Sequence, residues 1–107
     1  MAVICGVDIV YIPKIRKMIG NDALLKKFFH HKELSPDAQH LAGIIAAKEA
    51  FFKALGMVPK FDAIEIIYEA SGRPKIKPAP EFKSYKSCDV SISHDKDYAI
   101  ALVVMEK

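Results

Sequence analysis

A helical segment over residues 41–55 constrains the fold more than any other part of the chain. At about 100° per residue its large apolar side chains fall in one stripe, and much of the remaining surface carries only small residues. The stripe comprises Leu41, Ile44, Ile45, Phe51, Phe52 and Leu55, and the small residues are Gly43, Ala47, Ala50 and Ala54. A helix without a broad charged face is expected to be covered by other elements on several sides.

Start and stop signals place this helix in a mixed architecture. Ser35-Pro36 predicts the N-cap and first turn, and Gly56 predicts the end. The patterns around it predict strands at 2–10 and 62–68, short helices at 14–18 and 22–30, an extended piece at 75–77, and a hairpin pairing 90–92 with 98–105. We therefore expect a single α+β domain spanning residues 1–107, with one long central helix packed on a mainly antiparallel sheet.

Composition excludes several classes of protein. Hydrophobic residues make up 51% of the chain and charged residues 27%, which is typical of a globular domain. No apolar run approaches the roughly 20 residues of a membrane-spanning helix, and the first ten residues lack a basic leader and a cleavage site, so a cytoplasmic location away from membranes is expected. Cys5 and Cys88 show no zinc-ligand spacing, and we expect both to be buried free thiols.

The only charges of the segment 41–55 are unusual in their placement. Lys48 falls inside the apolar stripe, where a charge is costly unless it is paired or reaches solvent, and Glu49 and Lys53 lie four residues apart on its flank. A buried helix with a Glu–Lys pair worth about 0.2–0.5 kcal/mol would explain this pattern. A phosphate or metal site would also explain it, and the spacing leaves both interpretations open.

Asp8 raises the same question, because it lies within the apolar strand predicted at 2–10. A carboxylate in such a strand requires a partner, which is either a lysine or a divalent cation. Mg²⁺ takes oxygen ligands from one or two carboxylates together with substrate phosphates. Asp8 and Glu49 would form such a pair if the end of the strand packs beside the helix.

His94 follows the apolar strand residues Val90 and Ile92, and strand ends commonly present side chains to ligands. It is otherwise an ordinary turn histidine. The remaining histidines, His30, His31 and His40, form no recognised ligand spacing and are left out of the candidate site.

Positive charge is concentrated in the first third of the chain, although the formal net charge is only +3. The residues concerned are Lys14, Arg16, Lys17, Lys26 and Lys27. Such a cluster suits an acidic protein partner or a polyphosphate, or else it is a solvated helix surface. No nucleic-acid partner is expected.

Four segments of the sequence resemble one enzyme family in order and spacing. Gly6-Val7-Asp8-Ile9 matches a G-[IVL]-D-I motif, and residues 41–43 with 46–56 match a signature helix containing Lys-Glu-Ala. Gly72-Arg73-Pro74 matches a G-[KR]-P turn, and residues 90–94 match an S-[IV]-[ST]-H segment followed by Tyr98-Ala99. Together they resemble holo-acyl carrier protein synthase, the small trimeric bacterial type of 4′-phosphopantetheinyl transferase, over nearly the whole chain.

The resemblance implies transfer of the 4′-phosphopantetheine of coenzyme A to a serine of apo-acyl carrier protein, with release of adenosine 3′,5′-bisphosphate, in cytoplasmic fatty acid biosynthesis. It also implies a homotrimer with sites at the subunit interfaces. The expected magnesium ligands are Asp8 and Glu49, and the expected catalytic residues are Glu49 and Lys53. Coenzyme contacts are expected from Lys48, Gly72, Arg73, Pro74, Ser93 and His94, and carrier-protein contacts from Lys14, Arg16 and Lys17.

Three positions depart from the family pattern and concern the nucleotide pocket and the carrier contacts. Ile44 stands where the family often has arginine, residues 57–59 replace a Gly-Thr-Gly-like run, and the segment 31–40 is short. Two other functions remain open at this point. A non-catalytic coenzyme A or nucleotide-binding module would differ from the enzyme in lacking turnover, and a structural subunit would not bind coenzyme A with magnesium.

Overall fold

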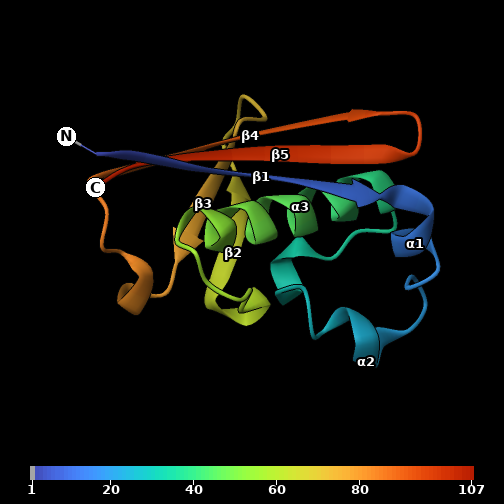
Figure 1. Ribbon diagram of the computed structural model, residues 1–107. Helices are drawn as coiled ribbons and strands as arrows, with labels where there is room; N and C mark the ends of the chain where they lie inside the picture. The colour runs from blue at the N-terminus through green and yellow to red at the C-terminus, as the bar shows by residue number, and fades with distance from the viewer. Residues whose placement is uncertain (1) are drawn as a thin grey trace.

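The computed structural model describes residues 2–107 and shows two antiparallel sheets arranged around one long helix (Figure 1). The α+β architecture expected from the sequence is confirmed. The strands are β1 (Val3–Tyr11), β2 (Ile64–Tyr68), β3 (Pro74–Pro78), β4 (Ser87–Asp95) and β5 (Tyr98–Glu106). The helices are α1 (Ile12–Arg16), α2 (Asp22–Leu25) and α3 (Ala38–Ala54), with single 3₁₀ turns at His31–Glu33, Phe61–Ala63 and Pro80–Phe82.

The larger sheet has the order β1-β5-β4, so the C-terminal strand lies in its centre. Its register places Gly6 opposite Val103 and Asp8 opposite Ala101. The predicted hairpin is confirmed as β4 and β5, and the predicted strands at 62–68 and 75–77 form the separate two-stranded sheet β2-β3. In Figure 1, α3 runs along one face of the larger sheet.

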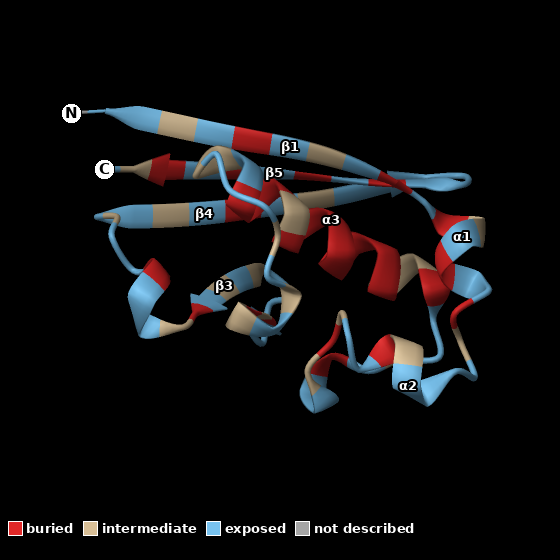
Figure 2. Cartoon of the chain, turned by 60° about the horizontal axis from the view of Figure 1, so that its bottom comes forward, coloured by how far each residue is buried: buried red, intermediate tan, exposed pale blue. Residues whose placement is uncertain are grey.

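The core is built around α3, which is buried on nearly all sides (Figure 2). Five residues of the predicted stripe are buried and Leu55 is half-buried, while the small residues Gly43, Ala47 and Ala50 are buried as well. The expectation that other elements cover this helix on several sides is therefore confirmed. None of the helices in residues 2–107 combines the length and apolar composition that crossing a bilayer requires.

Gly6 allows β1 and α3 to touch backbone to backbone. A Cβ atom built on Gly6 would lie 2.1 Å from the carbonyl oxygen of Ala50 and 2.7 Å from the amide nitrogen of Ala54. Real Cβ contacts are never this short, so only glycine fits here. This contact sets the distance between the strand that carries Asp8 and the helix that carries Glu49.

The start of α3 differs from the sequence prediction. The N-cap is Asp37, whose Oδ1 accepts a hydrogen bond from the Gln39 amide at 3.0 Å, and the helix begins at Ala38. Ser35 instead accepts from the Asp37 amide at 3.1 Å and so forms the turn that precedes the helix. Ser and Asp are both good caps, and the later of the two begins the helix.

Two other local predictions were wrong. The helix expected at 22–30 ends at Leu25, after which the chain turns and the Phe28 carbonyl accepts a hydrogen bond from Lys48 instead. Cys5 is exposed rather than buried, because it alternates with Gly6 and faces away from α3, and Cys88 is half-buried.

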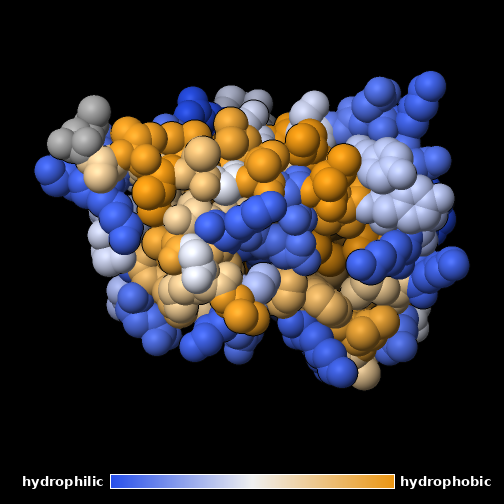
Figure 3. Space-filling model, viewed as in Figure 1, coloured by the Kyte–Doolittle hydropathy of each residue, from blue (hydrophilic) through white to orange (hydrophobic). Residues whose placement is uncertain are grey.

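The face of the larger sheet that points away from α3 is apolar along two strands, and we call it the outer sheet face. Side chains on β1 and β5 leave between 37% and 61% of their surface exposed there. They are Val3, Val7, Ile9, Tyr11, Tyr98, Ile100, Leu102 and Val104. Figure 3 shows apolar side chains gathered over β1, and a patch of this extent is characteristic of an interaction surface.

We expect Gly6→Ala to lower the free energy of unfolding by about 3 kcal/mol, the upper part of the range for overpacked interiors, because the added methyl group meets backbone atoms that cannot rotate away. Urea denaturation would measure the change. Cys5→Ala, one residue earlier on the exposed side of the strand, serves as the control and should shift stability by less than about 0.5 kcal/mol. Equal stability of the two variants would contradict the close contact.

Candidate functional site

The carboxyl groups of Asp8 and Glu49 meet where β1 crosses α3. Gly6 brings the two backbones into contact, and the Glu49 carboxyl lies within hydrogen-bonding reach of Asp8. The Oδ2 atom of Asp8 is buried and has no hydrogen-bond partner within residues 2–107. Two facing carboxyl groups with an unsatisfied buried oxygen form an arrangement that a hard cation would complete.

The environment of this pair favours the protonated form of Glu49. Burial raises the pKa of Glu49 to about 7, and the hydrogen bond and negative charge of Asp8 act in the same direction. Lys14 and Lys53 oppose this shift with their positive charges. Glu49 is therefore a carboxyl group whose charge changes near neutral pH.

Lys53 lies beside the pair without forming a salt bridge to it. Its ammonium group is exposed and donates a hydrogen bond to the carbonyl of Val7 at 3.1 Å. Within the described chain, Glu49 takes part in none of the ion pairs. The Glu49–Lys53 pair that would have explained the charges of α3 is therefore not formed.

A cavity of about 320 Å³ opens next to Glu49 and has a mostly apolar wall. Lys14 contributes a positive charge from α1, and Met18, Phe28 and Ile45 contribute apolar surface. We call this space the Glu49 cavity. Arg16 and Lys17 are exposed nearby on the surface but do not line it.

Lys48 has no access to this cavity or to solvent. Its side chain and that of Glu33 are fully buried, and the Lys48 Nζ atom lies 2.7 Å from Glu33 Oε1. The same ammonium donates to the carbonyls of Phe28 and Phe61, at 2.8 and 3.0 Å. All three of its donors are used within the chain, which leaves none for the phosphate that the sequence analysis expected Lys48 to contact.

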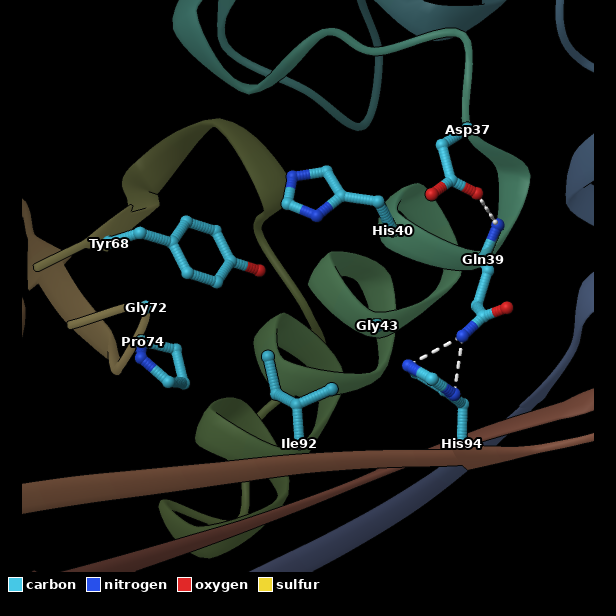
Figure 4. A pocket seen from close by; sticks show the side chains of 9 residues that line it. All are labelled: Asp37, Gln39, His40, Gly43, Tyr68, Gly72, Pro74, Ile92 and His94. Atoms are coloured by element: carbon cyan, nitrogen blue, oxygen red, sulfur yellow. Dashed lines mark hydrogen bonds between the residues drawn. The ribbon is translucent and has the colours of Figure 1, made fainter. Parts of the chain in front are cut away.

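A second cavity, of about 220 Å³, gathers residues of two segments that the sequence analysis assigned to the coenzyme (Figure 4). We call it the His94 cavity. Gly72 and Pro74 line it from the start of β3, and His94 lines it from the end of β4. The side-chain amide of Gln39 donates a hydrogen bond from its Nε2 atom to the ring of His94. This cavity thus combines the predicted turn and the predicted strand end.

Two further residues of this cavity were not predicted. The rings of His40 and Tyr68 lie 5.1 Å apart, and Figure 4 shows the Tyr68 side chain directed toward His40. His40 was not predicted because it forms no recognised ligand spacing with the other histidines. One signal in the sequence could have indicated His40. This residue lies one helical turn before Ile44, a position that the family resemblance associates with the nucleotide pocket.

Ser93 and Arg73 do not line the His94 cavity. Successive strand side chains point to opposite faces, so Ser93 lies on the outer sheet face when His94 faces inward. Arg73 is exposed and lies 3.2 Å from Asp89 in a surface ion pair. Only part of the predicted coenzyme set therefore converges within one chain.

The Glu49 and His94 cavities have no lining residue in common. They open on different sides of α3, one beside Glu49 and the other beside His40 and Gly43. Within residues 2–107, no cluster of three or more His, Cys, Asp or Glu side chains is arranged to hold a metal ion. A cation at Asp8 and Glu49 would therefore need further oxygen ligands from a substrate or solvent.

Comparison with known proteins decides the family. A sequence model of the 4′-phosphopantetheinyl transferase superfamily matches residues 4–103. The chain belongs to this superfamily. Among relatives, the holo-[acyl-carrier-protein] synthase of Nautilia profundicola is 41% identical, over 95% of this chain and 98% of its own length. That of Ehrlichia ruminantium is 37% identical, over 100% and 98% respectively.

Solved structures of phosphopantetheinyl transferases agree. The Helicobacter pylori holo-[acyl-carrier-protein] synthase in complex with coenzyme A superimposes with a TM-score of 0.89 at 32% identity, covering 95% of this chain and 99% of that one. A Bacillus anthracis synthase in complex with coenzyme A (3′,5′-ADP) gives 0.81 at 30% identity, with 98% of each chain covered. The family and enzyme class expected from the sequence are confirmed.

The raised pKa of Glu49 predicts a pH dependence of stability in the absence of divalent cations. A carboxyl group with a raised folded-state pKa contributes stability at low pH that is lost as the pH rises toward about 7. Between pH 5 and pH 8, the melting temperature of the wild type should therefore fall relative to that of Glu49→Gln, whose amide does not titrate. The same dependence of melting temperature on pH in the two proteins would contradict the raised pKa of Glu49.

Proposed function

We propose that this phosphopantetheinyl transferase moves the 4′-phosphopantetheine arm of coenzyme A onto a serine of apo-acyl carrier protein and releases adenosine 3′,5′-bisphosphate. The observation that carries the proposal is the Asp8–Glu49 pair with its unsatisfied buried oxygen, in a chain of this superfamily. The setting proposed for the reaction is cytoplasmic fatty acid biosynthesis.

Magnesium fits this pair by the chemistry of its donors. Mg²⁺ prefers oxygen ligands and is commonly held by one or two carboxylates together with substrate phosphates. Asp8 and Glu49 supply two carboxylates, and the unsatisfied Oδ2 atom of Asp8 lacks a partner that a cation would provide. When bound, the ion would neutralise charge on the pyrophosphate of coenzyme A.

The chain's own residues supply the other requirements of the transfer. Lys53 has an exposed ammonium group beside the pair and is suited to stabilise the departing phosphate. Either Glu49 or a water molecule held beside it is suited to accept the proton of the attacking serine hydroxyl. The apolar wall of the adjacent Glu49 cavity limits access of water to these groups.

We place the nucleotide part of coenzyme A at the His94 cavity, supported by the convergence there of Gly72, Pro74 and His94. Ser93 and Arg73 remain coenzyme contacts only if they act outside this cavity. Coenzyme complexes of the Helicobacter pylori and Bacillus anthracis relatives support coenzyme A as the donor.

A homotrimer with sites at the subunit interfaces explains two observations on the single chain. The outer sheet face is apolar along β1 and β5, as expected of a surface covered by other copies. In addition, the Glu49 and His94 cavities are separate within one chain, so joining them across an interface would complete one site.

The test of the proposed function is mass spectrometry of an apo-acyl carrier protein after incubation with the protein, coenzyme A and Mg²⁺. A mass gain of one phosphopantetheine that requires all three components is expected. Binding of coenzyme A without any mass gain would instead establish the non-catalytic binding module.

Asp8→Asn and Glu49→Gln should each fold and lose about a hundredfold or more in turnover, because an amide keeps the volume of the side chain but removes the charge. Steady-state kinetics at limiting Mg²⁺ would measure the loss. Near-normal turnover by both variants would contradict the magnesium assignment.

We propose that Lys14, Arg16 and Lys17 attract the acidic carrier protein, since all three side chains are exposed. Lys17→Glu, which lies outside the Glu49 cavity, should lower kcat/KM for the carrier. Added salt should narrow the difference in kcat/KM between this variant and the wild type, because screening lengths fall below about 10 Å above 0.1 M. Lys83→Glu reverses an exposed charge outside this group and is the matched control. Equal effects of the two substitutions would leave the group as a solvated surface.

A further inference from the structure

The buried pair formed by Lys48 and Glu33 connects segments that are distant in sequence. Both side chains are completely inaccessible to solvent. Besides Lys48, Glu33 accepts hydrogen bonds from the amides of His30 and Ile66, each at 2.7 Å. The carboxylate thereby ties the loop before α3 to β2, and the ammonium ties that loop to α3.

Lys48 also holds the wall of the Glu49 cavity. Its ammonium donates to the Phe28 carbonyl at 2.8 Å, and the Phe28 side chain lines this cavity. The Phe61 carbonyl accepts from the same ammonium at 3.0 Å, and the Phe28 and Phe61 rings pack edge to face with centroids 4.9 Å apart. Lys48 therefore holds Phe28 in two ways. It binds the Phe28 carbonyl directly, and it binds the carbonyl of Phe61, whose ring packs against the Phe28 ring.

Besides the contact of α3 with Gly6, the three hydrogen bonds of Lys48 oppose rotation of the helix about its axis. Adjacent side chains on a helix point about 100° apart. Lys48 points toward Glu33 in the loop before α3, and Glu49, the next residue, points toward Asp8 on β1. A rotation of the helix that moved Glu49 away from Asp8 would break three hydrogen bonds of the buried ammonium.

We propose that Lys48 and Glu33 form a positioning pair that holds Glu49 and the Phe28 wall in the geometry required for the cation and the carrier serine. The proposal rests on the proposed function of the Asp8–Glu49 site. Lys48 acts here through its neighbours and does not touch substrate.

Stability alone is a weak explanation for this pair. Desolvating two charges offsets most of their attraction, and well-packed neutral side chains of similar size are often as stabilising. Removing only one partner, however, leaves a buried charge uncompensated and is strongly destabilising. A stabilising role and a positioning role can therefore be separated by removing one charge or both.

The test compares Lys48→Met with the double variant Glu33→Gln/Lys48→Met. Both remove the donor to the Phe28 carbonyl, but only the single variant leaves a buried unpaired carboxylate. The double variant should therefore melt at a higher temperature than Lys48→Met. Both should bind Mg²⁺ about tenfold more weakly than the wild type in calorimetry without coenzyme A, a loss of the order seen when supporting contacts of metal ligands are removed.

Phe82→Leu is the matched stability control. Phe82 is buried against the ring of Phe52, a contact that involves neither Lys48 nor the Glu49 cavity. This variant should melt at a lower temperature and bind Mg²⁺ like the wild type.

Wild-type Mg²⁺ affinity in the folded double variant would overturn the positioning role. Weak binding in Phe82→Leu as well would also overturn it, because the loss would then follow stability. Failure of the proposed function would look different from failure of the positioning role. The wild type itself would then show no magnesium-dependent modification of the carrier protein.

Discussion

Contact between the backbones of β1 and α3 at Gly6 determines the geometry of the site. A carboxylate on a sheet and one on a helix are normally separated by at least one layer of side chains, and here that layer is missing at one residue. Asp8 and Glu49 consequently meet in a partly buried position, where burial and the negative charge of Asp8 raise the pKa of Glu49. The sheet register, the small residues of α3 and the unsatisfied oxygen of Asp8 are all consistent with this one close contact.

Much of the fold followed from the sequence, because the signals for it were local and periodic. The stripe on α3 correctly predicted which of its large side chains are covered, and the patterns at 90–92 and 98–105 correctly predicted the hairpin of β4 and β5. A carboxylate within an apolar strand indicated that Asp8 needs a partner, and its Oδ2 atom is buried without one within residues 2–107. The motif around Gly6 pointed to the same position, but only the structure shows that glycine is required there for lack of space rather than for backbone conformation.

Other features depended on contacts between distant segments and could not be predicted. The position of Lys48 in the apolar stripe required a partner, yet nothing in the sequence identified Glu33, which lies in a short polar segment 15 residues earlier. The directions of the Ser93 and His94 side chains were not predicted either. Both residues were assigned to the coenzyme, although strand alternation places them on opposite faces of the sheet. Cys5 was misassigned because an apolar strand was assumed to be buried on both faces.

If Asp8 and Glu49 form one cation site, Mg²⁺ must change the titration of Glu49, which NMR of the ¹³C-labelled Glu49 carboxyl measures with and without the ion. Without the ion, Glu49 should titrate near pH 7. Saturating Mg²⁺ should move the titration to lower pH in the wild type and have a much smaller effect in Asp8→Asn, because bound cation and proton compete for the same oxygens. A Glu49 titration that Mg²⁺ leaves unchanged in the wild type would contradict a cation site formed by the two carboxyl groups.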